Sequence, residues 1–306
     1  MEDRENHSSE ESSADDAMHL AEVTGPPTTA PQPAGSRWQN VATILAVVLL
    51  VVGPVVYLGL PDEVSRWYVA AAMEAYENGD VPGALGYMNA AGRWAPNNPA
   101  IYIYGGSWKQ RRGDYEGSLA EYNKALEIDP VNELALIQRS EVLQHLGRHD
   151  QAIADWKKLA SSSAMSRIQS RVVYLNGLAY AQALGNTDLD AALENIESAI
   201  RGAGQNAAML DTRGFIQYRR GDLKSARADL ELAVKMVEKD YGKIAQGEQF
   251  LPPGPLQTSL KEYARSVAVI RYHRSLVYDA LDKPEAAEKD LARVRELGFE
   301  PGEHLF

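Results

Sequence analysis

A repeat period of about 34 residues constrains this chain more than any other feature of its sequence. Three glycines, Gly79, Gly113 and Gly147, keep this step. Self-similarity at such a period marks a repeat architecture, because a unit of this size cannot bury its own apolar face and must stack on its neighbours. A stacked array offers long concave surfaces to partners, whereas an enzyme needs converging polar groups. Three further sets share the step: Ala84, Ser118 and Ala152; Met88, Tyr122 and Trp156; Ala91, Ala125 and Leu159.

The residues inside each period resemble the tetratricopeptide repeat, a pair of antiparallel helices joined by a short turn. The clearest unit, Tyr102 to Pro130, reads YIYGGSWKQRRGDYEGSLAEYNKALEIDP. Gly113 and Asp114 break one helix and cap the next. Ala125 is small where the two helices cross, and Pro130 cannot extend the second helix. The resemblance implies an all-α fold, a right-handed α-solenoid of helix-turn-helix units.

About six units follow this pattern, and the expected solenoid occupies residues 61–306. The fourth unit is looser and carries extra residues between its helices. The sixth lacks the turn glycine, and an insertion with a proline-rich run separates it from the fifth. A helix can start at Leu256 and continue into the sixth unit. The expected boundaries are 65–98, 99–132, 133–166, 170–206, 207–240 and 268–301, with the insertion at 241–267.

The stretch from Val41 to Leu60 is the second strong feature. No charged residue occurs between Arg37 and Asp62. A helix of this length spans about 30 Å, the thickness of the hydrocarbon core of a bilayer. The preceding segment lacks the basic residues of a secretion signal, and no cleavage site of small residues follows. The sequence therefore predicts a retained single-pass transmembrane helix over 38–60, with the repeats on the non-cytoplasmic side of the membrane.

Residues 1–37 form an acidic, proline-rich tail, with eight acidic residues against two basic ones. Such a segment cannot bury enough apolar surface to order itself, so we expect it to be disordered. The whole chain has a net charge of −11 and no cysteine. An acidic balance argues against a nucleic-acid partner, and the lack of cysteine excludes disulfides and thiol chemistry.

No group of side chains predicts catalysis, so we expect neither an enzyme nor a metal, a cofactor or a small-molecule substrate. His145 and His149 have the spacing of two metal ligands on one helix. Gly147 lies between them at an expected turn, which places the two imidazoles on different helices. His273 stands alone on a first helix, and we interpret it as a groove or packing residue.

The resemblance implies that the first helix of each unit lines the concave face. Aromatic and arginine side chains at the inner positions are the types that dominate binding hot spots. The alternative role for these side chains is packing between repeats, and we expect about half of them to have that role. A subtype that clamps acidic chaperone tails is disfavoured, because Lys and Asn are replaced by Val69, Met73, Ile103 and Ser107. The candidate groove residues are Tyr76, Tyr104, Arg111, Tyr174, Phe215, Tyr218, Arg219 and Tyr272.

Two classes of function remain open. The first is a membrane-anchored scaffold or adaptor that binds protein or peptide partners through its concave surface. The second is an accessory or regulatory structural subunit of an envelope assembly or secretion complex, with its groove filled by its own insertion. An empty aromatic groove favours the first class, and a filled groove favours the second.

Overall fold

The computed structural model describes residues 35–162, 167–247 and 256–302, and every regular element in these ranges is an α-helix. The chain divides after Tyr57 into two compact units, residues 1–57 and 58–306. Residues 1–34, where we expected most of the disordered tail, lie outside the described ranges. The repeats lie in the second of these units.

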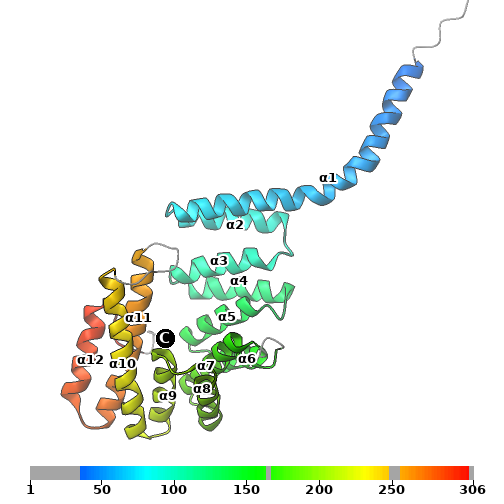
Figure 1. Cartoon of the computed structure of the whole chain (residues 1–306). Coiled ribbons are helices and arrows are strands. Elements are labelled where there is room, and N and C mark those ends of the chain that lie inside the picture. The colour runs from blue at the N-terminus through cyan, green and yellow to red at the C-terminus, as the bar shows by residue number, and fades with distance from the viewer. Residues whose placement is uncertain (1–34, 163–166, 248–255, 303–306) are drawn as a thin grey trace, which may run out of the picture. The chain divides into compact units, whose positions relative to one another are not determined.

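The described helices follow one another in antiparallel pairs, and Figure 1 shows the pairs from α3 onward stacked along the array. The last part of α1 forms the first pair with α2, since the hydroxyl of Ser65 donates to the carbonyl of Ala91. The helices are α1 (Gly35–Glu77), α2 (Val81–Trp94), α3 (Pro99–Arg111), α4 (Tyr115–Ile128), α5 (Glu133–His145), α6 (His149–Ala160), α7 (Ile168–Leu184), α8 (Leu189–Ala203), α9 (Ala207–Arg219), α10 (Leu223–Ala245), α11 (Leu256–Ala280) and α12 (Pro284–Glu296).

The positions that recur with the repeat period in the second helices form the core between repeats. In α2, α4 and α6, each of the three sets of residues that recur with the repeat period is buried. The aromatic members of these sets, Tyr122 and Trp156, each pack against a glycine of a neighbouring first helix. A Cβ added to Gly106 would lie 2.6 Å from the ring of Tyr122, and one added to Gly177 would lie 2.6 Å from the ring of Trp156. Close helix contact therefore depends on pairing a large residue with a glycine.

The turn glycines recur because the backbone there is left-handed. Gly79, Gly113, Gly147 and Gly221 have φ angles of +81°, +80°, +69° and +83°. A side chain is disfavoured in this conformation, which makes glycine the default residue. The sixth pair, which lacks the glycine, places Asp282 at φ 56° instead. Aspartate tolerates this region better than most residues, so the turn survives without glycine.

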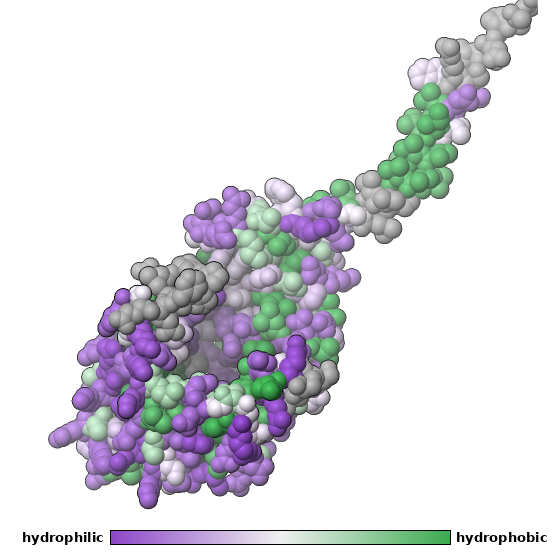
Figure 2. All heavy atoms as spheres, viewed as in Figure 1, coloured by the Kyte–Doolittle hydropathy of each residue, from purple (hydrophilic) through white to green (hydrophobic). Residues whose placement is uncertain are grey.

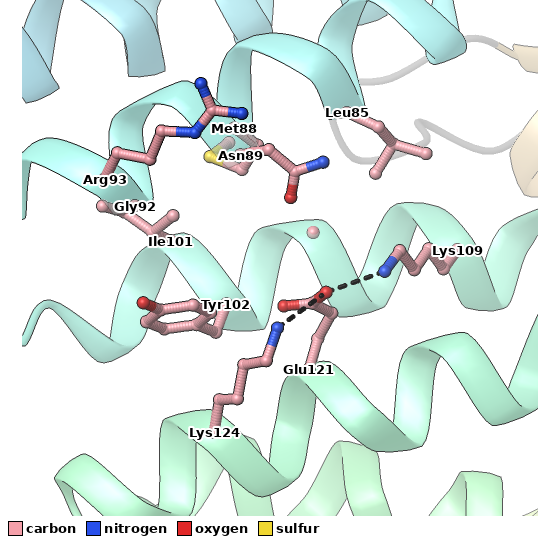
Figure 3. Close-up of a pocket in the computed structure, with 11 residues that line it drawn as sticks. Leu85, Met88, Asn89, Gly92, Arg93, Ile101, Tyr102, Lys109, Glu121 and Lys124 are labelled. Atoms are coloured by element: carbon pink, nitrogen blue, oxygen red, sulfur yellow. Dashed lines mark hydrogen bonds and ion pairs between the residues drawn. The ribbon is translucent and has the colours of Figure 1, made fainter. Parts of the chain in front are cut away.

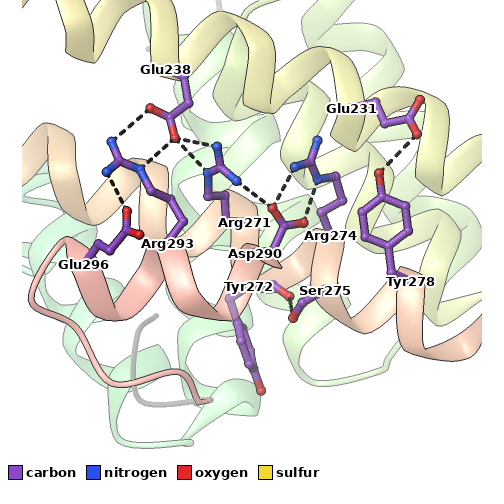
Figure 4. A network of polar contacts seen from close by, with 10 residues as sticks. All are labelled: Glu231, Glu238, Arg271, Tyr272, Arg274, Ser275, Tyr278, Asp290, Arg293 and Glu296. Atoms are coloured by element: carbon purple, nitrogen blue, oxygen red, sulfur yellow. Dashed lines mark hydrogen bonds and ion pairs between the residues drawn. The ribbon is translucent and has the colours of Figure 1, made fainter. Parts of the chain in front are cut away.

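In three repeats the two helices are joined by a largely buried ion pair between an arginine and the aspartate 16 residues further on. Each guanidinium donates two hydrogen bonds of 2.7–2.8 Å to one carboxylate. Figure 4 shows the pair in the last repeat, Arg274–Asp290. There Arg271 donates to both Asp290 and Glu238, and Arg293 donates to Glu238, so that these bonds connect α10, α11 and α12. The three pairs are Arg139–Asp155, Arg213–Asp229 and Arg274–Asp290.

The expected insertion at 241–267 is helical wherever it is described, apart from the turn that follows α10. Helix α10 continues to Ala245, and α11 begins at Leu256, where the sequence permits a helix to start. Residues 248–255, which include the proline-rich run, are not described. The insertion therefore lengthens the two helices on either side of it.

Over the described part of the chain, no helix contains a stretch that is both long and apolar enough to cross a membrane. The expected span from Val41 to Leu60 lies within α1, and the side chains of residues 53–58 lie outside the described set. The expectation of a transmembrane helix thus has no support from the described residues. The large apolar side chains between Val41 and Val52 are exposed, and Figure 2 shows them as a hydrophobic run.

Candidate functional site

A cavity of about 1720 Å³ lies along the array and is lined by the first helices of successive pairs, α3, α5, α7 and α9. We call this cavity the groove. Figure 2 shows the hollow on this face of the molecule. The lining combines aromatic, amide and charged side chains with apolar ones. Such a mixture suits a polypeptide segment better than a compact apolar ligand.

The N-terminal half of α11 forms one side of the groove. Lys261, Glu262, Arg265 and Ser266 line it, and all four belong to the expected insertion. The segment Gly298–Glu300, which follows α12, contributes as well. The described part of the insertion therefore forms one side of a cavity that still measures about 1720 Å³.

Two of the eight expected groove residues, Tyr76 and Arg111, line this cavity. The ring of Tyr76 stacks on Trp108, with centroids 4.7 Å apart and planes 9° from parallel. Arg111 is exposed in the last turn of α3, and Arg112 beside it also lines the groove. A stacked tyrosine and two exposed arginines thus belong to the lining of the groove.

Two other expected residues are buried in the core. Tyr174 is 2% exposed, and its hydroxyl donates to Glu133 Oε2 at 2.7 Å. Phe215 is 4% exposed and stacks on His273, with centroids 4.1 Å apart. The imidazole of His273 lies 2.8 Å from Asp211 Oδ1, which ties α11 to α9. Packing of α11 against α9 therefore removes Phe215 from the surface.

The remaining four expected residues lie outside the groove lining. Tyr218 is half-buried and stacks on Phe215, and the guanidinium of Arg219 lies 5.9 Å from the same ring. Tyr272 packs beside the small cluster of Ala268 and Val294. Tyr104 is 44% exposed but does not line the cavity.

The sequence-based selection missed the amide side chains of the groove. Gln110 and Gln144 both line it and stand one repeat period apart, so the period itself could have identified them. Gln138 and Asn176 line it from α5 and α7. An amide offers both a donor and an acceptor, as a peptide group does. The selection favoured aromatic and arginine side chains and therefore passed over them.

Glu141 is the titratable group of the groove with the clearest pKa shift. Glu141 lines the groove and is exposed to it, and the protein groups packed around its carboxyl partly desolvate it and raise its pKa to about 7. A hydrogen bond from Gln110 and the charge of Arg265 act in the opposite direction. Gln138 Nε2 also lies 3.4 Å from Glu141 Oε2. Glu141 is therefore partly protonated near pH 7.

A second, smaller cleft of about 220 Å³ lies between α2, α3 and α4. Figure 3 shows Lys109 and Lys124 directed toward Glu121, with Nζ–Oε1 distances of 2.7 and 3.6 Å. The Nζ atom of Lys124 also lies 5.7 Å from the ring centroid of Tyr102. Because both lysines already contact a carboxylate of this chain, the cleft has less to offer a charged ligand than the groove.

Solved structures similar to this chain are tetratricopeptide-repeat proteins and their fold relatives. One such protein from Parabacteroides merdae aligns with a TM-score of 0.53 and 15% identity, over 78% of this chain and 94% of that one. PilW, a type IV pilus biogenesis factor, aligns with a TM-score of 0.52 and 16% identity, over 76% and 93%. MamA from Desulfovibrio magneticus RS-1 aligns with a TM-score of 0.50 and 18% identity, over 57% and 96%.

No protein-family model matches the sequence. The structural similarities nevertheless show the class of fold: the helix pairs of residues 58–306 form a tetratricopeptide-like array. The resemblance noted in the sequence is confirmed at this level.

Proposed function

We propose that this chain is a scaffold protein that holds a segment of a partner protein in its groove and performs no chemistry of its own. The observation that carries the proposal is one continuous cavity of about 1720 Å³ lined by four first helices and by α11. Arrays of this kind use extended concave surfaces for binding. A cavity that runs across several repeats matches an elongated partner segment.

The side chains of the groove indicate what such a segment contains. Arg111 and Arg112 are exposed near Tyr76, and neither makes an ion pair to another described residue. Guanidinium groups in this state bind carboxylates well. Gln110, Gln144 and other amides suit the peptide groups of the backbone. We therefore favour a segment whose acidic side chains meet the arginines near α3.

The test uses the full chain to capture partners and then compares matched variants. We expect Arg111→Ala and Tyr76→Ala each to weaken binding by about 2 kcal/mol, which is roughly thirtyfold in Kd. Arg219→Ala is the control, since it removes an exposed arginine that lies outside the groove. Groove variants that stay folded by circular dichroism and keep full affinity would overturn the proposal.

A structural subunit of an envelope assembly is the second candidate. It is favoured by α11, because Lys261 and Arg265 of the insertion already line the groove. PilW, which shares the fold, is named as a pilus biogenesis factor. Co-purification from native membranes separates the two candidates. A fixed stoichiometry that survives substitution of Arg111 supports a structural subunit, and an exchangeable partner supports the scaffold.

We also propose that residues 41–60 anchor the chain in a membrane, with the repeats on the non-cytoplasmic side. The support is the charge-free apolar sequence between Arg37 and Asp62 and the exposure of its described side chains. Carbonate extraction followed by intact-mass measurement tests the anchor. Recovery of a soluble chain that begins near residue 61 would contradict it, and protease protection in sealed vesicles tests the orientation.

A further inference from the structure

Tyr122 and Trp156 occupy the same position in consecutive repeats. Both are buried between first helices, and each carries one polar atom at the tip of its ring system. The hydroxyl of Tyr122 lies 3.0 Å from Oε1 of Gln110 and 3.3 Å from Oε1 of Gln138. Because Gln110 and Gln138 line the groove, the polar tip at this repeat position reaches the layer of side chains that forms its floor.

Trp156 is different, because its polar atom has no partner. Its side chain is 4% exposed and is held over Gly177, yet it contributes to the lining of the groove. Its Nε1 atom is buried and makes no hydrogen bond to any described residue. An indole N–H can only donate, and buried donors in native proteins are nearly always paired. The described residues therefore supply no acceptor for this donor.

Asn176 lies next to Gly177 on α7, which packs against α6, and it also lines the groove. Its Oδ1 atom is buried and likewise has no hydrogen-bond partner in the described part of the chain. One wall of the groove thus holds an unpaired donor on α6 and an unpaired acceptor on α7. Val172 and Val173, also on this wall, are apolar. An uncharged group that both accepts and donates fits this wall.

We propose that Trp156 and Asn176 form a subsite for a single peptide group of the segment held in the groove. The indole N–H donates to the carbonyl oxygen of that group, and the side-chain oxygen of Asn176 accepts from its N–H. A carboxylate offers no donor and a guanidinium offers no acceptor, so neither satisfies both atoms. This assignment rests on the proposed function, since it names the part of the partner that this wall contacts.

The probe is N-methylacetamide, the smallest molecule with one peptide group. The full chain is labelled with 15N at tryptophan, and its five tryptophans give five indole signals that Trp→Phe variants assign. We expect a saturable shift confined to the Trp156 signal. N,N-dimethylacetamide keeps the carbonyl but lacks the N–H, so it should need about fivefold higher concentration, the factor that corresponds to one net hydrogen bond.

Asn176→Leu provides the matched variant. It should leave the saturable shift of Trp156 in place and abolish the preference for N-methylacetamide over N,N-dimethylacetamide. The proposal is overturned if the Trp156 signal shifts linearly with the concentration of N-methylacetamide, as expected for the buried Trp108, which serves as the reference signal. The proposal is also overturned if the Trp156 indole proton shows a long-lived contact with water and its signal does not saturate with N-methylacetamide, since a water molecule is then the partner. The indole titration uses the chain without a partner, so it can fail independently of the partner-binding test. If Arg111→Ala loses the partner but the Trp156 signal does not respond to N-methylacetamide, the groove proposal stands and the subsite proposal fails.

Discussion

Arg213 donates two hydrogen bonds, each 2.7 Å long, to the two carboxylate oxygens of Asp229 and thereby joins the two helices of one repeat. The same geometry recurs at Arg139–Asp155 and Arg274–Asp290. Each pair lies between the helices, where the aspartate is buried. The array thus repeats a polar contact as well as an apolar one. This fixed separation between an arginine and the aspartate that follows it is a signal that sequence reasoning overlooked.

Removal of one partner of this ion pair should destabilise the array. We expect Arg213→Met to cost about 3 kcal/mol in the free energy of unfolding, because the buried carboxylate of Asp229 is left unpaired. The double variant Arg213→Met, Asp229→Leu should recover much of this loss. Urea denaturation measures all three chains. Arg201→Met, which breaks an exposed pair with Glu197, is the control and should cost less than about 0.5 kcal/mol. Equal small effects for the two single variants would contradict the prediction.

A methyl group at Gly177 should disturb the groove wall. The added Cβ would lie 2.6 Å from the ring of Trp156, so the indole must move. We expect Gly177→Ala to cost about 1–3 kcal/mol in stability and to shift the fluorescence of Trp156. Gly86→Ala is the matched control, since a Cβ there meets nothing within 4 Å in α2, and it should stabilise by about 0.5–1 kcal/mol. The idea fails if both alanine variants have the same stability.

The left-handed turns make opposite predictions for two positions. Gly113 has φ +80° with open space around it, so Gly113→Ala should cost about 1 kcal/mol through backbone strain alone. Asp282 has φ 56° at the corresponding turn of the last pair, and Asp282→Gly should relieve strain there. Thermal unfolding followed by circular dichroism compares the two variants with the parent. A lower Tm for Asp282→Gly would mean that the aspartate side chain stabilises the turn.

Glu141 should give the protein a measurable pH dependence. Its pKa is raised from 4.5 to about 7 by desolvation, so between these values the folded chain holds a proton that the unfolded chain has lost. Stability from this group is therefore lost as the pH rises toward 7. We expect Glu141→Gln to flatten this part of the stability profile by at most about 1 kcal/mol, because water inside the groove screens the charge. Identical profiles for the two chains would show that Glu141 titrates normally.

The apolar positions of the fold could be predicted because they depend on local spacing. Ala84, Tyr122 and Trp156 recur with the repeat, and each is buried as the period requires. The groove residues were harder, since aromatic side chains serve packing and binding equally well. Tyr76 lines the cavity whereas Phe215 is covered by α11, and both are aromatic residues of first helices. The difference depends on which helix packs against each ring.

The sequence alone determined the repeat, its turns and its helical class, because glycine, proline and small residues act through the backbone of neighbouring positions. Tertiary structure decided the shape and chemistry of the groove. The approach of α11 buries Phe215 and places Arg265 on the lining, although these residues are far apart in the sequence. Packing between helices also leaves Trp156 Nε1 and Asn176 Oδ1 without partners among the described residues. The state of these two atoms depends on which groups the packing of the helices brings to them, so the repeat period alone does not reveal it.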